Sequence, residues 1–177
     1  MGLEKKIRRL GEIYARAFSI SLDEVALPSG RVTERIRVNH PDASALVPIL
    51  DDGRVLLVKQ YRYSIHEETL EIPAGKIDPG EDPEACVRRE FEEETGYKVN
   101  NVEFLLKFAP AIGYSSEILY LYKGTGIQKI EASPHSDEIS SVLALSLDQI
   151  RNKIYNQEIK DGKTLVGLYS LFSEALL

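Results

Sequence analysis

The segment from Asp82 to Gly96 constrains this chain more than any other, because it combines helix-end signals with a concentration of charge. Asp82-Pro83 is a typical helix start, with the aspartate as N-cap and the proline in the first turn. Gly96 is a typical residue just past a helix end. At about 100° per residue, three carboxylates share an arc of about 100°: those of Glu90, Glu93 and Glu94. The pattern predicts a helix whose acidic stripe adjoins an apolar stripe containing Val87 and Phe91.

The acidic stripe raises the question of what balances its charge. Like charges one turn apart repel by ~0.2–0.5 kcal/mol per exposed pair, and by more where water is scarce. Residues 81–94 hold seven acidic side chains against two basic ones, so Arg89 can neutralise only part of the stripe. Glutamates can simply coat a solvated helix, but a bound cation would favour the same arrangement. Carboxylates without histidine or cysteine select hard ions, Mg²⁺ or Mn²⁺. Cys86, about one turn before Glu90, is expected to be a packing residue and not a ligand.

Composition narrows the class of protein further. The chain has 177 residues, of which 43% are apolar and 28% charged, so it can bury a core without disulfides. Its net charge of −6 argues against nucleic acid as a main partner. No apolar run approaches the ~18 residues of a membrane span, and the charged start lacks the apolar stretch of a signal peptide. With a single cysteine, we expect a cytoplasmic protein with no membrane partner.

The N-terminal third is expected to form a small antiparallel β region. Residues 3–10 are expected to form a short basic helix, and alternating apolar residues from Tyr14 onward predict strands on both sides of a turn near Gly30. A loop over 39–42 predicts a boundary, so we expect N-terminal strands in 1–42 and the main domain in 43–177.

The main domain mixes strands with a few helices, which indicates a layered α/β fold. Two apolar runs, 44–50 and 55–61, are joined by Asp51-Asp52-Gly53 and predict a hairpin. Further strands are expected over 102–108, 117–122 and 139–145, and helices over 147–154 and 163–176.

The residues flanking the acidic stripe carry a family resemblance. Gly75, Glu81 and the run from Arg89 to Tyr97 match the whole 23-residue Nudix box. Seven fixed residue types at a background of ~6% each would match by chance on the order of 10⁻⁹ per window. The resemblance implies an α/β/α sandwich with a mixed sheet and a metal-dependent hydrolase of nucleoside diphosphates linked to another moiety.

Carried over by position, the resemblance implies a role for each residue of the box. Glu90, Glu94 and the carbonyl of Ala74 would be metal ligands for two or three Mg²⁺, or Mn²⁺, ions. Glu93 would be a supporting acid, and Arg89 would orient the glutamates. Glu81 would tie the loop to the helix.

Around the box, the chain resembles the ADP-ribose pyrophosphatase branch of the family. Gln60-Tyr61-Arg62, the run 70–78 and the run 158–164 carry this likeness, which covers roughly residues 14–175. In this branch the N-terminal strands build a homodimer. The matching substrate-contacting positions are Arg62, Lys76, Gly113 and Glu117. One departure is Ile112, which stands where the branch usually carries a proline.

The resemblance implies hydrolysis of ADP-ribose, or of a related nucleoside diphosphate sugar, to AMP and ribose 5-phosphate. The general base is expected to be Glu138, with Asp137 next and Glu93 as the third candidate. Two alternatives stay open: a Nudix hydrolase of another substrate (a dinucleoside polyphosphate, a GDP-sugar or an oxidised nucleotide), and a non-catalytic Nudix module that binds a nucleotide.

Overall fold

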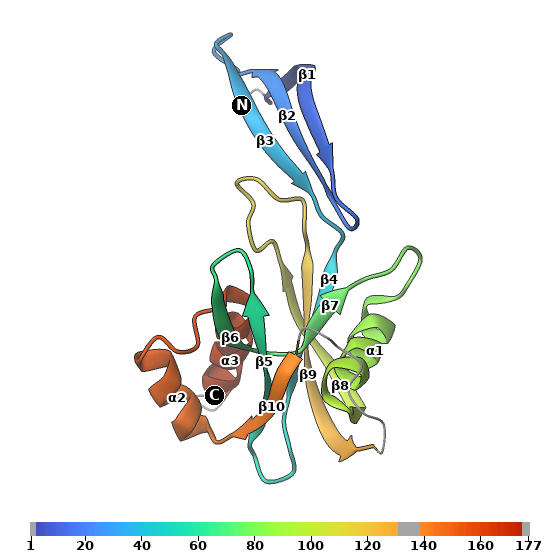
Figure 1. Cartoon of the computed structure of the whole chain (residues 1–177), viewed down its shortest axis with the longest axis vertical. Helices are drawn as coiled ribbons and strands as arrows, with labels where there is room; N and C mark the ends of the chain where they lie inside the picture. Colours follow the sequence, from blue (N-terminus) through green and yellow to red (C-terminus); the bar gives the residue numbers. More distant parts are fainter. Residues whose placement is uncertain (1–2, 131–138, 175–177) are drawn as a thin grey trace. The chain divides into compact units, whose positions relative to one another are not determined.

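A computed structural model describes residues 3–130 and 139–174 of the chain (Figure 1). The strands are β1 (Lys5–Tyr14), β2 (Ser19–Ala26), β3 (Val32–Asn39), β4 (Ala43–Pro48), β5 (Val55–Arg62), β6 (Glu67–Glu71), β7 (Ala74–Lys76), β8 (Tyr97–Phe108), β9 (Leu119–Lys129) and β10 (Ile139–Leu145). The helices are α1 (Pro83–Thr95), α2 (Leu147–Tyr155) and α3 (Gly162–Glu174). The chain divides into two compact units, and the segment Phe108–Leu119 belongs to the same unit as the chain up to Asp42.

The first unit contains an antiparallel sheet in the order β1-β2-β3. The expected helix over residues 3–10 is wrong, because this segment pairs with β2 as strand β1. Cross-strand ion pairs favour the strand: Arg8 binds Glu24 at 3.2 Å, and Lys6 binds Asp23 at 2.6 Å. The antiparallel N-terminal β region is therefore confirmed, whereas its role in dimerisation stays a prediction.

The second unit contains two sheets, in the orders β7-β4-β9-β8 and β10-β5-β6. The expected turn between β4 and β5 forms, with the amide of Gly53 donating to the carbonyl of Leu50. The expected hairpin is only partly formed, since the two strands share one bridge, Ile49 with Val55, and then enter different sheets. They separate because β4 hydrogen-bonds to β7 and β9, and β5 to β6 and β10.

Helices cover both sides of this second unit. In Figure 1, α1 lies on one side of its strands, and α2 and α3 lie on the other. Helix α1 packs on β4 and β7, and α3 packs on β4. One core cluster combines residues of the helix and the strands: Leu46, Leu56, Val87, Phe91, Val99 and Tyr122. The α/β/α sandwich expected from the sequence is confirmed.

The two C-terminal helices agree with their predicted positions to within a few residues. Helix α2 begins with a capping box between Ser146 and Gln149. Within the described ranges, no helix combines the length and the apolar character that crossing a bilayer would require.

Candidate active site

Helix α1 has the ends that its sequence predicts. The Asp82 carboxylate accepts hydrogen bonds from the amides of Glu84 and Ala85, and Pro83 occupies the first turn. Gly96 ends the helix in the left-handed conformation (φ 72°), which a residue without a Cβ adopts without strain. Phe91, buried on the apolar side of the helix, fixes its rotation. The acidic stripe is thereby turned toward β7.

Glu94 lies against the start of β7. Its Oε2 accepts a hydrogen bond of 3.1 Å from the amide of Ala74. Strand β7 is itself held by antiparallel pairing with β4, in which Ala74 faces Ala45. Burial raises the pKa of Glu94 to about 8, and the negative charge of Glu90 adds to this effect, while the Ala74 amide and the cations Lys163 and Arg62 oppose it.

Glu90 occupies space that only a glycine in β7 leaves open. A Cβ built on Gly75 would lie 1.9 Å from Cδ of Glu90, which is far inside van der Waals contact. Burial also raises the pKa of Glu90, although Arg89 donates to its Oε1 at 2.7 Å. The helix therefore presses two like-charged carboxylates, one turn apart, onto the same short strand.

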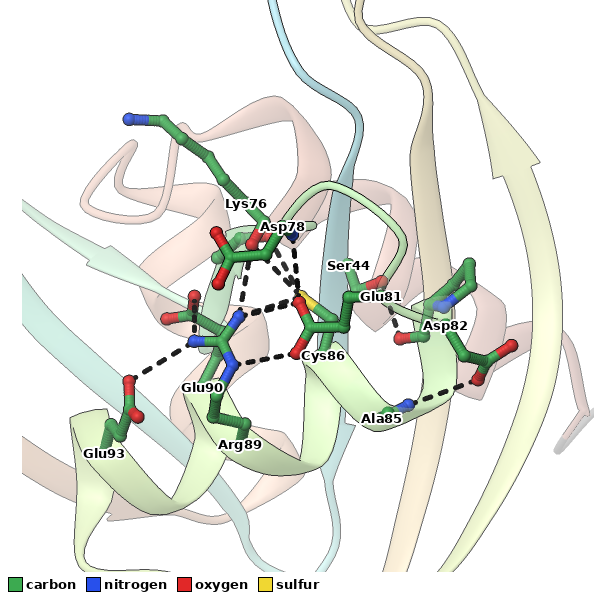
Figure 2. A network of polar contacts seen from close by, with 12 residues as sticks. Ser44, Lys76, Asp78, Glu81, Asp82, Ala85, Cys86, Arg89, Glu90 and Glu93 are labelled. Carbon is green, nitrogen blue, oxygen red and sulfur yellow. Dashed lines mark hydrogen bonds and ion pairs between the residues drawn. The ribbon is translucent and has the colours of Figure 1, made fainter. Parts of the chain in front are cut away.

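Arg89 is the hub that binds the loop before α1 to the helix (Figure 2). Its Nε and Nη2 donate to the two carboxylate oxygens of Glu81, each at 2.9 Å. This pairing lowers the pKa of Glu81 to about 2, and the amide of Asp78 contributes. Nη1 of Arg89 donates to Glu90 and, at 3.4 Å, to Glu93. Arg89 thus contacts two of the glutamates that it is predicted to orient, and the orienting role itself stays a prediction.

The donor set fits a hard divalent cation. Glu90 and Glu94 supply carboxylate oxygens whose charged forms are disfavoured by burial, so a cation between them would remove the repulsion. The carbonyl of Ala74 would add a third oxygen, as expected from the sequence. Among the described residues, no three acidic, histidine or cysteine side chains are grouped as a metal site. Cys86 is buried, with its Sγ 3.4 Å from the carbonyl of Lys76 in β7, and burial raises the pKa of its thiol to about 12, which agrees with packing rather than ligation.

A second polar cluster, which we call the Glu71 network, lies between β6 and the start of α3; it comprises Arg62, Thr69, Glu71 and Lys163. Glu71 is 1% exposed, yet it accepts from Arg62 at 2.6 and 2.7 Å, from Thr69 at 2.6 Å and from Lys163. Burial raises the pKa of Glu71, but the cations Arg62 and Lys163 outweigh burial and lower it to about 2. Glu71 and Lys163 were not among the site residues predicted from the sequence. The available signal was a charged residue, Glu71, between the apolar residues Leu70 and Ile72.

The remaining predicted site residues fall in different places. Arg62 belongs to the second unit and binds Glu71, so its predicted phosphate contact stays a prediction. Lys76 gives its carbonyl to Arg89 at 3.3 Å while its side chain extends away (Figure 2). Gly113 and Glu117 belong to the first unit, where Glu117 lies 3.8 Å from the ring of His40. Glu138, like Asp137, lies outside the described residues.

Comparisons with known proteins extend the resemblance over nearly the whole chain. A family model described as the NUDIX domain matches residues 39–165. A methanol dehydrogenase activator of Bacillus methanolicus is 37% identical over 98% of this chain and 96% of its own length. An ADP-ribose pyrophosphatase of Bacillus subtilis (strain 168) is 31% identical over the same shares of the two chains. A solved structure of an ADP compounds hydrolase covers 98% of this chain and 95% of its own, with 22% identity and a TM-score of 0.78, which supports the fold.

The contact between Gly75 and Glu90 predicts the effect of one added methyl group. Gly75→Ala is expected to displace the Glu90 carboxylate and to weaken Mn²⁺ binding by ~10-fold or more, as measured by calorimetry. Gly162→Ala is the matched control, because a Cβ at Gly162 meets no atom within 4 Å. Equal Mn²⁺ affinities for the two variants would contradict the placement of Glu90.

The raised pKa of Glu94 predicts a pH-dependent loss of stability in the metal-free protein. The pKa of Glu94 is about 8 in the folded state against an ordinary value of 4.5. The free energy of unfolding is therefore at its full value below pH 4.5 and falls as the pH rises from 4.5 through about 8. Glu94→Gln removes the loss, and we expect the variant to be roughly 2–5 kcal/mol more stable than the wild type at pH 9, with little difference at pH 5. Urea denaturation in EDTA measures the free energy of unfolding of the two proteins at pH 5 and pH 9. Glu92→Gln is the control, because Glu92 pairs with Lys98 instead of lying against β7. Parallel pH profiles for wild type and Glu94→Gln would contradict the burial of this charge.

Proposed function

Because this chain belongs to the NUDIX domain family, as a Nudix pyrophosphohydrolase of the ADP-ribose pyrophosphatase branch, we propose that it hydrolyses the diphosphate bond of ADP-ribose or a related nucleoside diphosphate sugar with the aid of divalent metal ions. The products would be AMP and ribose 5-phosphate. One observation carries the proposal: Glu90 and Glu94 lie one turn apart against β7, where Glu94 binds the amide of Ala74. The named ADP-ribose pyrophosphatase relative supports the substrate class.

The roles of the α1 residues follow from their contacts. Glu90, Glu94 and the carbonyl of Ala74 would hold two or three Mg²⁺, or Mn²⁺, ions. When bound, such ions neutralise charge on the diphosphate oxygens and help to orient the substrate. Arg89 keeps Glu90 in place through its own anchor on Glu81. With such ions bound, the protein could hold a dianionic substrate beside two carboxylates that would otherwise repel it.

The chemical step needs a proton acceptor. A water molecule attacks one phosphorus in line with the leaving phosphate, the bridging P–O bond on that phosphorus breaks, and the water gives up a proton. Glu138 is the proposed acceptor, followed by Asp137 and then Glu93. Glu93 is supported by its place on α1, where its carboxylate is half exposed and 3.4 Å from Arg89. Arg62, Lys76, Gly113 and Glu117 are proposed to contact the substrate.

We also propose that two chains form a homodimer through the N-terminal strands of residues 1–42, with residues 43–177 as the hydrolase domain. Large apolar side chains on β1 and β3 are exposed, among them Ile13 at 68% and Ile36 at 58%, which favours a partner surface. The buried, unpaired thiol of Cys86 supports a reducing compartment, and we propose the cytoplasm.

A second candidate function rests on the 37% identity with the methanol dehydrogenase activator, which extends over 98% of this chain. The chain would then raise the activity of a methanol dehydrogenase. Adding wild type and Glu94→Gln to a purified methanol dehydrogenase separates this function from hydrolysis. Activation by the wild type alone would show that the two functions share one site.

Product analysis in Mg²⁺ tests the proposed function. ADP-ribose, other nucleoside diphosphate sugars, dinucleoside polyphosphates and nucleoside triphosphates are compared at one concentration, and we expect AMP and ribose 5-phosphate with ADP-ribose preferred. Glu94→Gln is expected to lower turnover by about two orders of magnitude or more, because it removes a metal ligand. The control Glu92→Gln should keep wild-type turnover. Binding of a nucleotide without turnover of any substrate would favour the non-catalytic module instead.

The homodimer predicts a mass near twice 19.9 kDa by light scattering at micromolar concentration. Ile13→Lys and Ile36→Lys place charges on exposed β positions and are expected to shift the mass toward the monomer. A monomeric wild type would contradict the dimer, whatever its activity.

A further inference from the structure

The start of α3 carries polar contacts that the proposed reaction does not use. Asp161 caps the helix, since its Oδ2 accepts from the amide of Thr164 at 3.0 Å and from Nζ of Lys163 at 3.0 Å. The hydroxyl of Thr164 also donates to this oxygen at 2.6 Å. Capping needs only the Asp161 side chain and the helix amides. Because the Thr164 hydroxyl donates its proton to Asp161, its oxygen can accept a hydrogen bond from another part of the chain.

The Thr164 hydroxyl accepts a hydrogen bond of 2.9 Å from the amide of Ile72. Thr164 and Ile72 are both fully buried, so no water can replace this bond without opening the core. Asp161 orients the acceptor by taking the hydroxyl proton. Helix α3 thus holds the segment between β6 and β7 through a hydrogen bond to the backbone nitrogen of Ile72.

Two further contacts fix the same segment. Glu71, directly before Ile72, is bound to Lys163 of α3 and to Arg62 of β5. Helix α3 also lies very close to Ile72, because a Cβ built on Gly167 would be 3.2 Å from Cδ1 of Ile72 and 2.8 Å from Cγ2 of Val47. Polar and apolar contacts of α3 therefore converge on Glu71 and Ile72.

Ile72 is two residues from the backbone that holds Glu94. The carbonyl of Pro73 accepts from the amide of Leu46 at 3.0 Å, and the amide of Ala74 donates to Glu94. Pro73 has a fixed φ, so the short segment transmits the position of Ile72 to Ala74 with little freedom. A shift of Ile72 would move both the Ala74 amide and the Ala74 carbonyl relative to α1.

We propose that Thr164 is a positioning residue for the cation site: its hydroxyl, oriented by Asp161, fixes Ile72 and thereby places Ala74 against Glu94. The inference rests on the proposed function only in that Glu94 and the Ala74 carbonyl are taken as metal ligands. Thr164 itself touches neither substrate nor metal. Helix α3, far from the acidic stripe in sequence, is on this account part of the catalytic framework.

Thr164→Val tests the proposal, because valine keeps the shape of threonine and removes the hydroxyl, while Thr164→Ser restores it. We expect Thr164→Val to bind Mn²⁺ ~10-fold more weakly by electron paramagnetic resonance and to lower kcat by ~10- to 100-fold. KM for ADP-ribose is expected to stay within about 3-fold, and Thr164→Ser should recover most of both losses. By NMR, amide hydrogen exchange at Ile72 and Ala74 should accelerate in the valine variant alone.

Asp161→Asn gives a second test if Thr164→Val does not fold. Asparagine still caps the helix but is a weaker acceptor for the Thr164 hydroxyl, so intermediate losses of Mn²⁺ affinity and kcat are expected. Wild-type Mn²⁺ affinity and kcat in a folded Thr164→Val would overturn the proposal, as would equal losses in the serine variant. If the wild type neither binds Mn²⁺ nor hydrolyses ADP-ribose, the proposed function fails, while the amide exchange of Ile72 and Ala74 still decides the positioning role.

Discussion

The contact between two carboxylates of α1 and strand β7 is the interaction on which the site depends. Burial raises the pKa of both Glu90 and Glu94; the charge of Glu90 adds to the effect on Glu94, and the charges of Glu93 and Glu81 add to the effect on Glu90. The two carboxylates stay in this unfavourable place because Phe91 anchors another side of the helix in the core and Gly75 leaves room for the Glu90 side chain. A divalent cation would stabilise the charged forms of the two carboxylates, which burial disfavours in the metal-free protein, and this is the physical basis of the proposed function.

Two separate charge networks hold the two sides of this contact. Arg89 binds Glu81 and Glu90 and so joins the loop before α1 to the helix. The Glu71 network joins β5, β6 and α3, with Glu71 as a buried anion between Arg62 and Lys163. Glu71 is the buried member of its network, and removing Arg62 or Lys163 would leave its charge without compensation inside the protein. We propose that the two networks together hold β7 and α1 where the amide of Ala74 meets Glu94.

The sequence predicted the parts of this site that depend on local signals. Asp82-Pro83 and Gly96 defined α1, and helical spacing placed Glu90 and Glu94 on one side of it. The β1 strand was missed because its pairing depends on Arg8 meeting Glu24, 16 residues away, which local pattern does not encode. The separation of β4 and β5 into two sheets and the contact of Thr164 with Ile72, 92 residues apart, were missed for the same reason. Long-range pairing is decided by the packing of the whole unit, and single-sequence periodicity carries little of that information.

Glu90 and Glu94 are proposed to form a cation site in which the charged forms of both carboxylates are unfavourable until a cation binds. Calorimetric titration of Mn²⁺ at pH 7, in two buffers with different ionisation enthalpies, tests it most directly, because it reports affinity and proton release together. With the pKa of Glu94 at about 8, we predict tight binding that releases protons in the wild type. In Glu94→Gln, both the affinity and the proton release should fall. The same affinity and the same proton count in the two proteins would contradict the account.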